Sequence, residues 1–230
     1  MTSRLYDQVT GDALYLLYRI IRGTCRVQFS GEEHIQEAMD SGRPVVATTW
    51  HGKAYMVISC LTRIVDTSDF AVIMPNDWRG GTLAVLTRRI GASPIQVNLF
   101  DDPTLSAGRE VAKLVRWISG GRNTIIAPDG PDGPAYMPKP GVTYIARKAQ
   151  AIIVPIGGYC RHAYRLNRWD QYELPFPFSK VAIHVGKPFT IPPGRDDLGP
   201  MNEHLTNVLH RVNALAAVDY YPDHRRKHPG

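Results

Sequence analysis

The sequence predicts an α/β fold, in which a mainly parallel central sheet is flanked by helices. Short runs of apolar, often β-branched residues recur along the chain, and residues 44–49 form the first clear one. The segments between these runs carry apolar residues at helical spacing, and repeated strand–helix alternation is typical of parallel sheets with helices on both faces. The chain has 230 residues, so we expect residues 1–230 to form one domain with a sizeable core.

The first expected element is an amphipathic helix over residues 5–22, inside an N-terminal helical segment that covers residues 1–30. Its apolar residues recur at near-helical spacing, and tyrosines lie among them. Four arginines accompany the segment: Arg4, Arg19, Arg22 and Arg26. A helix with aromatic and basic side chains can lie in a membrane interface, so the segment is a candidate membrane-facing element. A helix that packs on its own domain would show the same apolar stripe.

The remaining elements alternate between strands and helices. A short helix opens at residues 31–35 and ends near residues 41–42. Strands are expected over residues 44–49, 70–74, 94–97, 123–127, 152–156 and 181–185. Helices are expected over residues 53–65, 81–90, 104–119, 142–149 and 201–218. Residues 161–178, rich in Arg, aromatics and Pro, form an ordered excursion over the sheet end, and residues 223–230 form a frayed tail.

The composition limits the partners and the location. The formal net charge is +6 and the pI is about 9.3, which favours anionic partners: a membrane surface, nucleic acid or an acidic carrier protein. No nucleic-acid-binding motif is present, so we expect no nucleic acid. Cys25, Cys60 and Cys160 form no Cys-x-x-Cys pair, so we expect no metal. Asp7 and Asp12 interrupt the N-terminal apolar run, and no stretch reaches about 18 apolar residues. We therefore expect a cytoplasmic protein, peripheral to the inner face of the membrane.

His51 is the first candidate for chemistry. It follows the apolar strand 44–49, in the run Trp50-His51-Gly52-Lys53. In open α/β sheets, ligands sit outside the carboxyl ends of the strands. An imidazole exchanges its proton near neutral pH, so His51 at such an end can act as a general base. The alternative is a histidine that only closes a turn.

Asp129 is the candidate partner of that imidazole. It follows the strand 123–127 and opens a turn rich in Pro and Gly. Parallel strands bring their carboxyl ends to one edge of a sheet, so Asp129 and His51 should lie on the same rim. A carboxylate orients an imidazole and stabilises its protonated form. An Asp that only caps its own turn is the alternative.

Lys139 and Gly141 form a third candidate feature, in the run Lys139-Pro140-Gly141 before a helix. Exposed amides at a helix start suit an anionic group, and Lys139 can add a point charge to it. A solvated lysine would fit equally well.

Four motifs together carry a resemblance to a known family. They are Trp50-His51-Gly52-Lys53, Ala127-Pro128-Asp129-Gly130-Pro131 continued by Gly133-Pro134, Lys139-Pro140-Gly141-Val142, and Ile-Val-Pro-Ile-Gly at residues 153–157. In this order and spacing, the chain from about Gly31 to Pro188 resembles the lysophospholipid acyltransferase-like superfamily. It is similar to a bacterial branch of unknown function that carries Trp-His-Gly-Arg and Pro-Asp-Gly-Pro-Arg-Gly-Pro.

The resemblance implies an acyltransferase fold and an acyltransferase activity. Such an enzyme moves a fatty acyl group from a thioester of CoA or acyl carrier protein to a hydroxyl or amine, without a metal or a bound cofactor. His51 matches the motif histidine that acts as general base. The residues expected to line the substrate site are Trp50, Lys53, Asn76, Asp77, Arg79, Gly130, Pro131, Lys139 and Gly141.

The chain departs from the superfamily pattern at two positions. Met56 stands where an acidic residue usually follows the motif histidine, so we expect Asp129 to replace that acid. Asp132 stands where an arginine usually helps to hold an acceptor phosphate, which argues against a phosphate-bearing acceptor. Two other functions use the same rim: a thioester hydrolase, with water as the nucleophile, and a non-catalytic protein that binds lipids or acyl chains.

Overall fold

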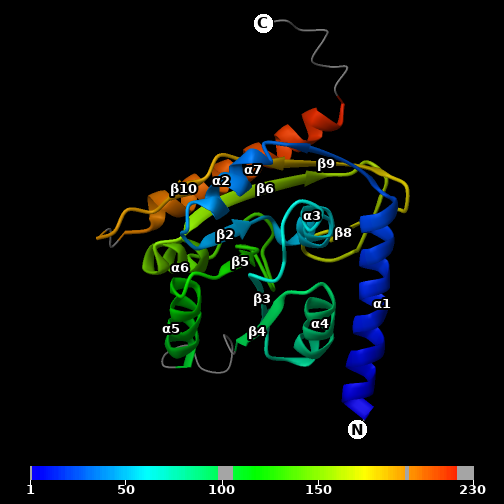
Figure 1. The fold of residues 1–230 in the computed structure, drawn as a ribbon, viewed down its shortest axis with the longest axis horizontal. Coiled ribbons are helices and arrows are strands. Elements are labelled where there is room, and N and C mark those ends of the chain that lie inside the picture. The colour runs from blue at the N-terminus through cyan, green and yellow to red at the C-terminus, as the bar shows by residue number, and fades with distance from the viewer. Residues whose placement is uncertain (1, 98–105, 195–196, 222–230) are drawn as a thin grey trace, which may run out of the picture.

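A twisted central sheet with helices on both faces forms the body of the molecule (Figure 1). The computed structural model describes residues 2–97, 106–194 and 197–221. Its strands are β1 (Arg26–Ser30), β2 (Val45–Thr48), β3 (Phe70–Pro75), β4 (Ser93–Val97), β5 (Asn123–Ile126), β6 (Ile152–Tyr159), β7 (Ala163–Arg165), β8 (Glu173–Pro175), β9 (Lys180–Val185) and β10 (Phe189–Thr190). Its helices are α1 (Thr2–Thr24), α2 (Glu33–Asp40), the 3-10 turn η1 (His51–Lys53), α3 (Ala54–Leu61), α4 (Trp78–Arg89), α5 (Ser106–Ser119), α6 (Gly141–Ala149) and α7 (Gly199–Tyr220).

The sheet is mainly parallel, as predicted. Its strand order within the described residues is β1-β9-β6-β2-β5-β3-β4, and β10 pairs with β6 outside this path. All neighbours on the path are parallel except β6 and β9, and β10 is also antiparallel to β6. The strands β2 and β5 are direct neighbours, so the chain that leaves each of them emerges at the same sheet edge.

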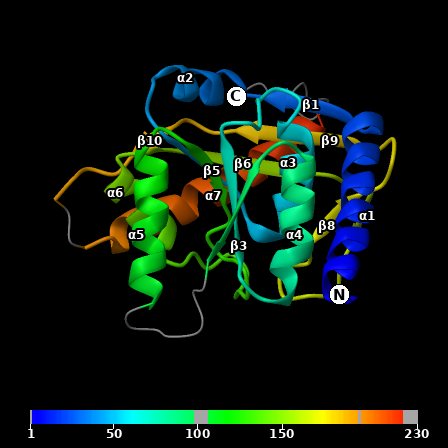
Figure 2. The same cartoon turned by 60° about the horizontal axis from the view of Figure 1, so that its bottom comes forward.

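Two separate cores explain why the central strands are apolar on both sides. Successive side chains of a strand point to opposite faces. In β2, Val45 and Ala47 pack into a first core with α1, α2 and α3, whereas Val46 packs into a second core with α5, α6 and α7. Figure 2 shows α1, α3 and α4 together on one side of the sheet and α5 and α6 on the other. Burial on both faces therefore requires the unbroken apolar runs seen in the sequence.

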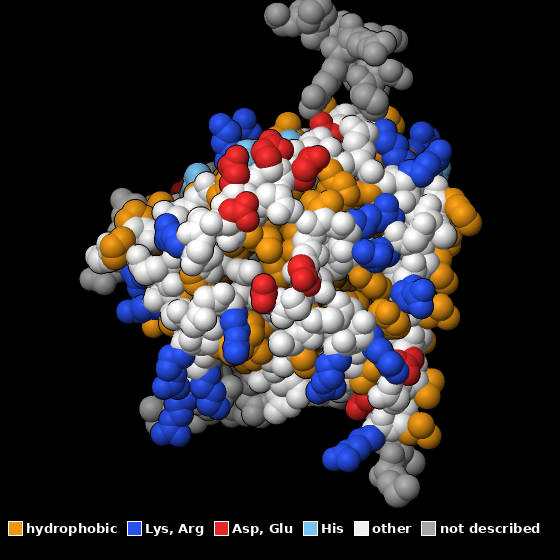
Figure 3. All heavy atoms as spheres, viewed as in Figure 1, with side chains coloured by type: hydrophobic (Ala, Val, Ile, Leu, Met, Phe, Trp, Pro, Cys, Tyr) orange, Lys and Arg blue, Asp and Glu red, His pale blue; other side chains and the backbone are white. Residues whose placement is uncertain are grey.

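The helix α1 packs on the rest of the protein and also exposes an apolar stripe. On its inner face Ile21 is fully buried, and the Tyr18 hydroxyl donates a hydrogen bond of 2.8 Å to Oγ1 of Thr62. On its outer face Leu5, Val9 and Leu16 are at least 60% exposed. Apolar side chains follow the outer edge of α1 on the right of Figure 3. None of the described helices is a candidate for a bilayer-spanning segment.

The structure differs from the prediction mainly in short or peripheral strands. The N-terminal segment expected to be helical through residue 30 is helical only to Thr24, and β1 follows and pairs with β9. The helix expected over residues 53–65 is shorter: α3 begins at Ala54, after the 3-10 turn η1, and ends at Leu61. The excursion at residues 161–178 contains the two-stranded sheet of β7 and β8, which is antiparallel. The predicted helix start at Thr104 and the predicted tail 223–230 lie outside the described residues.

Candidate active site

His51 begins η1, two residues beyond Thr49, the residue after the buried strand β2, and glycines at positions 52 and 130 allow close packing around this turn. Its backbone N–H donates a 2.9 Å hydrogen bond to Oδ1 of Asp129. A Cβ at Gly130 would lie 2.5 Å from Cδ2 of the His51 ring. A Cβ at Gly52 would collide with the backbone carbonyl oxygen of Asp170. Gly130 therefore lets the loop after β5 approach the imidazole, and Gly52 lets the backbone of Asp170 approach η1.

The partner of the imidazole is Asp170, so the prediction that Asp129 has this position is wrong. Nδ1 of His51 lies 2.6 Å from Oδ2 of Asp170, and the Asp170 side chain is fully buried. Asp129 is buried too, but it accepts the backbone N–H groups of His51 and Tyr136 and so fixes the two loops to each other. Asp129 and His51 do lie at the same edge of the sheet, as predicted. Asp129 contacts the backbone N–H of His51 there and not its ring.

The Asp170 carboxylate sets the orientation of the imidazole. A carboxylate only accepts, so Nδ1 donates to Asp170, and in the neutral tautomer that this contact selects, Nε2 is the nitrogen with the lone pair. No group in the described part of the chain hydrogen-bonds to Nε2, and the His51 side chain is 24% exposed. The rings of Trp169 and Tyr172 lie 5.3 and 5.5 Å from the His51 ring and restrict its rotation. Burial raises the pKa of the Tyr172 phenol above its usual range, so this ring is neutral.

A buried ion pair holds the excursion that carries Asp170. Nζ of Lys53, at the end of η1, lies 2.6 Å from Oε1 of Glu173, and both side chains are largely buried. Arg165 adds a second contact to the same oxygen at 3.3 Å. Arg168 contacts Oδ2 of Asp170 at 3.3 Å. The excursion therefore makes polar contacts with the residues at both ends of η1, and Lys53 is engaged in this pairing.

An apolar cavity of about 510 Å³ opens beside His51. It lies between the sheet and the helices α1, α3 and α4, and side chains of the excursion close one side. Its apolar lining includes Leu14, Ile58, Val72, Leu86 and Ile125. Of the predicted site residues, the lining contains His51, Arg79, Gly130 and Pro131. The cavity thus has a long apolar interior and an imidazole in its wall.

The other predicted substrate residues lie outside this lining. Trp50 is 1% exposed and packs in the second core, with its ring against Tyr136 and His210. Asn76 is exposed, Gly141 is the first residue of α6, and Lys139 donates a hydrogen bond to the Gly130 carbonyl oxygen.

Arg79 lines the cavity, as Arg168 does, and two carboxylates pair with Arg79. Asp77 caps the N-terminus of α4 by accepting the Arg79 backbone N–H, and its carboxylate also pairs with the Arg79 guanidinium. Hydrogen bonds from Arg79 hold the pKa of Asp77 below its usual value. Asp132, in the loop after β5, pairs with the same guanidinium at 2.8 Å. Within the described ranges no three His, Cys, Asp or Glu side chains group as metal ligands would.

Comparisons with known proteins support the fold. No protein-family model matches the chain. An uncharacterised protein of Rickettsia prowazekii, RP090, is 27% identical over 179 residues, which cover 77% of this chain and 79% of that protein. The crystal structure of PlsC, the 1-acyl-sn-glycerophosphate acyltransferase of Thermotoga maritima, is similar with a TM-score of 0.56 and 17% identity. That likeness covers 93% of this chain and 80% of the PlsC chain, and it shows an acyltransferase-like fold.

Proposed function

We propose that this protein is an acyltransferase that moves a fatty acyl group from a thioester to a hydroxyl or amine acceptor. One observation carries the proposal: an imidazole paired with a buried carboxylate lies in the wall of an apolar cavity of about 510 Å³. Ligand pockets of this kind combine a mostly apolar lining with a few converging polar groups. The similarity of the fold to PlsC supports this choice at a coarse level.

In the proposed reaction His51 is the general base. Nε2 takes the proton of the acceptor hydroxyl or amine while the acceptor oxygen or nitrogen attacks the thioester carbonyl carbon. The tetrahedral intermediate collapses, the carbon–sulfur bond breaks, and the imidazolium returns the proton to the leaving thiolate. Asp170 stabilises the imidazolium between these two steps. The acyl chain lies in the cavity, where its methylene groups leave water.

The charges beside the cavity favour an acceptor without a phosphate near His51. Two arginines line the cavity, and both already contact carboxylates: Arg79 pairs with Asp77 and Asp132, and Arg168 lies 3.3 Å from Oδ2 of Asp170. A phosphate would have to compete with these carboxylates for either guanidinium, and like charges at short range repel. A neutral hydroxyl or an amine fits this rim better.

The proposal extends to the acyl donor and to a membrane surface, both of which we expect to be anionic. A net charge of +6 favours an anionic donor such as acyl-CoA or the thioester of an acidic acyl carrier protein. The outer stripe of α1, with Leu5, Val9 and Leu16 exposed, supports docking on an anionic membrane surface. Because Tyr6 and Thr10 of α1 line the cavity, a membrane bound there would lie close to the acyl site.

The test is thiol release from acyl thioesters of several chain lengths, measured with and without alcohol and amine acceptors. Release that requires an acceptor supports the transferase. Release without an acceptor identifies a hydrolase, and acyl-chain binding without release identifies a binding protein. We expect His51→Ala to lower turnover by about 10²–10⁴-fold, the usual contribution of a general base. The matched control is His162→Ala, which removes an exposed imidazole outside the cavity lining.

A further inference from the structure

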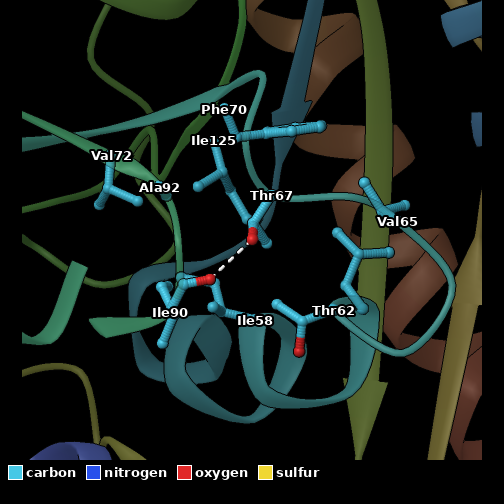
Figure 4. Close-up of a pocket in the computed structure, with 10 residues that line it drawn as sticks. Ile58, Thr62, Val65, Thr67, Phe70, Val72, Ile90, Ala92 and Ile125 are labelled. Carbon is cyan, nitrogen blue, oxygen red and sulfur yellow. Dashed lines mark hydrogen bonds between the residues drawn. The ribbon is translucent and has the colours of Figure 1, made fainter. Parts of the chain in front are cut away.

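A second, smaller cavity of about 30 Å³ lies beyond the large one, and Figure 4 shows it. Its lining is apolar apart from two threonines. Four residues line both cavities: Ile58, Val72, Ile90 and Ile125. A thin wall of these four side chains therefore separates the two spaces.

The two cavities follow one another along the direction of the strands. On β3, Pro75 lines only the large cavity, Val72 lines both, and Phe70 lines only the small one. On α3, Ala54 lines only the large cavity and Leu61 only the small one. Pro75 ends β3 and Ala54 begins α3, so both lie at the edge of the sheet where His51 lies. The small cavity is therefore the continuation of the large one, away from the imidazole.

The wall has two different components. Val72 and Ile125 belong to the sheet, so their backbone is fixed by neighbouring strands. Ile58 projects from α3, and Ile90 follows the last residue of α4. The position of Ile90 is fixed by Thr67, whose hydroxyl donates a 2.6 Å hydrogen bond to the Ile90 carbonyl oxygen, drawn as the dashed line in Figure 4. A wall anchored in this way resists displacement by a longer ligand.

We propose that Ile58 and Ile90 close the acyl site and set the longest acyl chain that it accepts. The inference rests on the proposed function, because it treats the large cavity as the acyl site. A saturated chain that enters beside His51 meets the two isoleucine side chains before it reaches the small cavity. A cavity of about 30 Å³ accommodates roughly two water-sized groups, so opening the wall should admit about two further methylene groups.

The experiment measures binding of free saturated fatty acids of stepwise length, by displacement of a fluorescent fatty acid, together with thioester turnover for the same lengths. We expect Ile58→Ala and Ile90→Ala to shift both optima toward chains about two carbons longer. Affinity for the longer chain should rise roughly tenfold, because each buried methylene contributes about fourfold. Ile58→Phe should shift both optima to shorter chains, which keeps the wall testable if an alanine variant collapses around the space.

The matched control is Ile118→Ala, which removes the same atoms from the second core and contacts neither cavity. It should keep the wild-type length profile. Folded Ile58 and Ile90 variants with that same profile would overturn the wall assignment. A wild-type protein that shows a length limit in binding but no thioester turnover would overturn the proposed activity and support the wall. A wild-type protein that binds no fatty acid of any length would overturn both.

Discussion

Replacing Asp170 by Asn tests whether this carboxylate supports the chemistry of His51. The substitution keeps the shape of the side chain and removes its charge. Asp170 is fully buried, and Oδ2 is the atom that contacts Nδ1 of His51 at 2.6 Å. Oδ1 is buried without a hydrogen-bond partner among the described residues. Thus the carboxylate makes its main contact with the imidazole, and Asn leaves an imidazolium without its counter-charge.

The size of the effect follows from the kind of hydrogen bond that is lost. A hydrogen bond to a charged group contributes about 1.5–3 kcal/mol. In the proposed mechanism the imidazolium forms when His51 takes the acceptor proton, so this energy acts on the transition state. At about 1.4 kcal/mol for each factor of ten, kcat should fall by roughly 10- to 150-fold. KM should change little, since Asp170 is not part of the cavity lining.

The assay is steady-state acyl transfer at saturating thioester, with proton NMR of the Nδ1 proton of His51 as a second readout. We expect Asp170→Asn to lower kcat, keep KM, and shift or broaden the Nδ1 signal. Asp132→Asn is the control, because Asp132 is an exposed partner of Arg79 at the same sheet edge. A folded Asp170→Asn protein with wild-type kcat, or with a loss confined to KM, would refute the positioning role.

Three other predictions concern the surface and the supports of the site. Leu16→Asp on the exposed face of α1 should weaken sedimentation with anionic vesicles, and sedimentation of the wild type should fall as the salt concentration rises. The control is Val218→Asp on α7, which also places a charge at an exposed apolar position. Equal sedimentation of the wild type and both variants would contradict the docking role of α1. Lys53→Met should lower the free energy of unfolding by about 3–5 kcal/mol, since it leaves Glu173 buried without its closest partner, and Lys53→Met combined with Glu173→Gln should lose less. Asp77→Ala should cost about 1 kcal/mol at neutral pH through loss of the α4 cap. Because Arg79 lowers the pKa of Asp77, that contribution is present above the unfolded pKa and is lost as pH falls through the folded pKa. Urea unfolding should therefore show the two proteins converging below about pH 4, and a constant difference would argue against the carboxylate.

The elements predicted well are those whose sequence pattern is set by burial. Residues 45–47 and 152–156 are apolar throughout, because their side chains fill a core on each face of the sheet. β1 was missed because residues 26–30 are partly exposed and lie next to a long helix, so no unbroken apolar run marks them. β10 has two residues and β7 three, too few for any period to be visible.

The candidate site was predicted in part for the same reason. His51 and Asp129 follow buried strands, and the topology of a parallel sheet brings such positions to one edge. Asp170 lies 119 residues after His51 in an excursion without strong periodicity, so neither motif nor spacing indicates its contact with the imidazole. The sequence offers one indirect signal: an acid is missing at Met56, and Asp170 lies between Trp169 and Tyr172 in an aromatic-rich segment. The side chain at Met56 is itself fully buried in the first core, where a carboxylate would be costly.

Asp170 lies on the excursion, so the pairing of His51 with its carboxylate depends on whether this segment is locally closed or open. The excursion is held by its short β7–β8 pairing, by polar contacts such as Lys53 to Glu173, and by packing of Tyr172 and Leu174 on the first core, whereas β7 and β8 make no strand pairing with the central sheet. Segments of this kind open with a smaller free energy than the strands of a core. Each opening would remove the counter-charge from His51 while the sheet, and thus global stability, stayed intact. Amide hydrogen exchange of residues 166–175 should therefore track the active fraction of molecules more closely than any melting temperature.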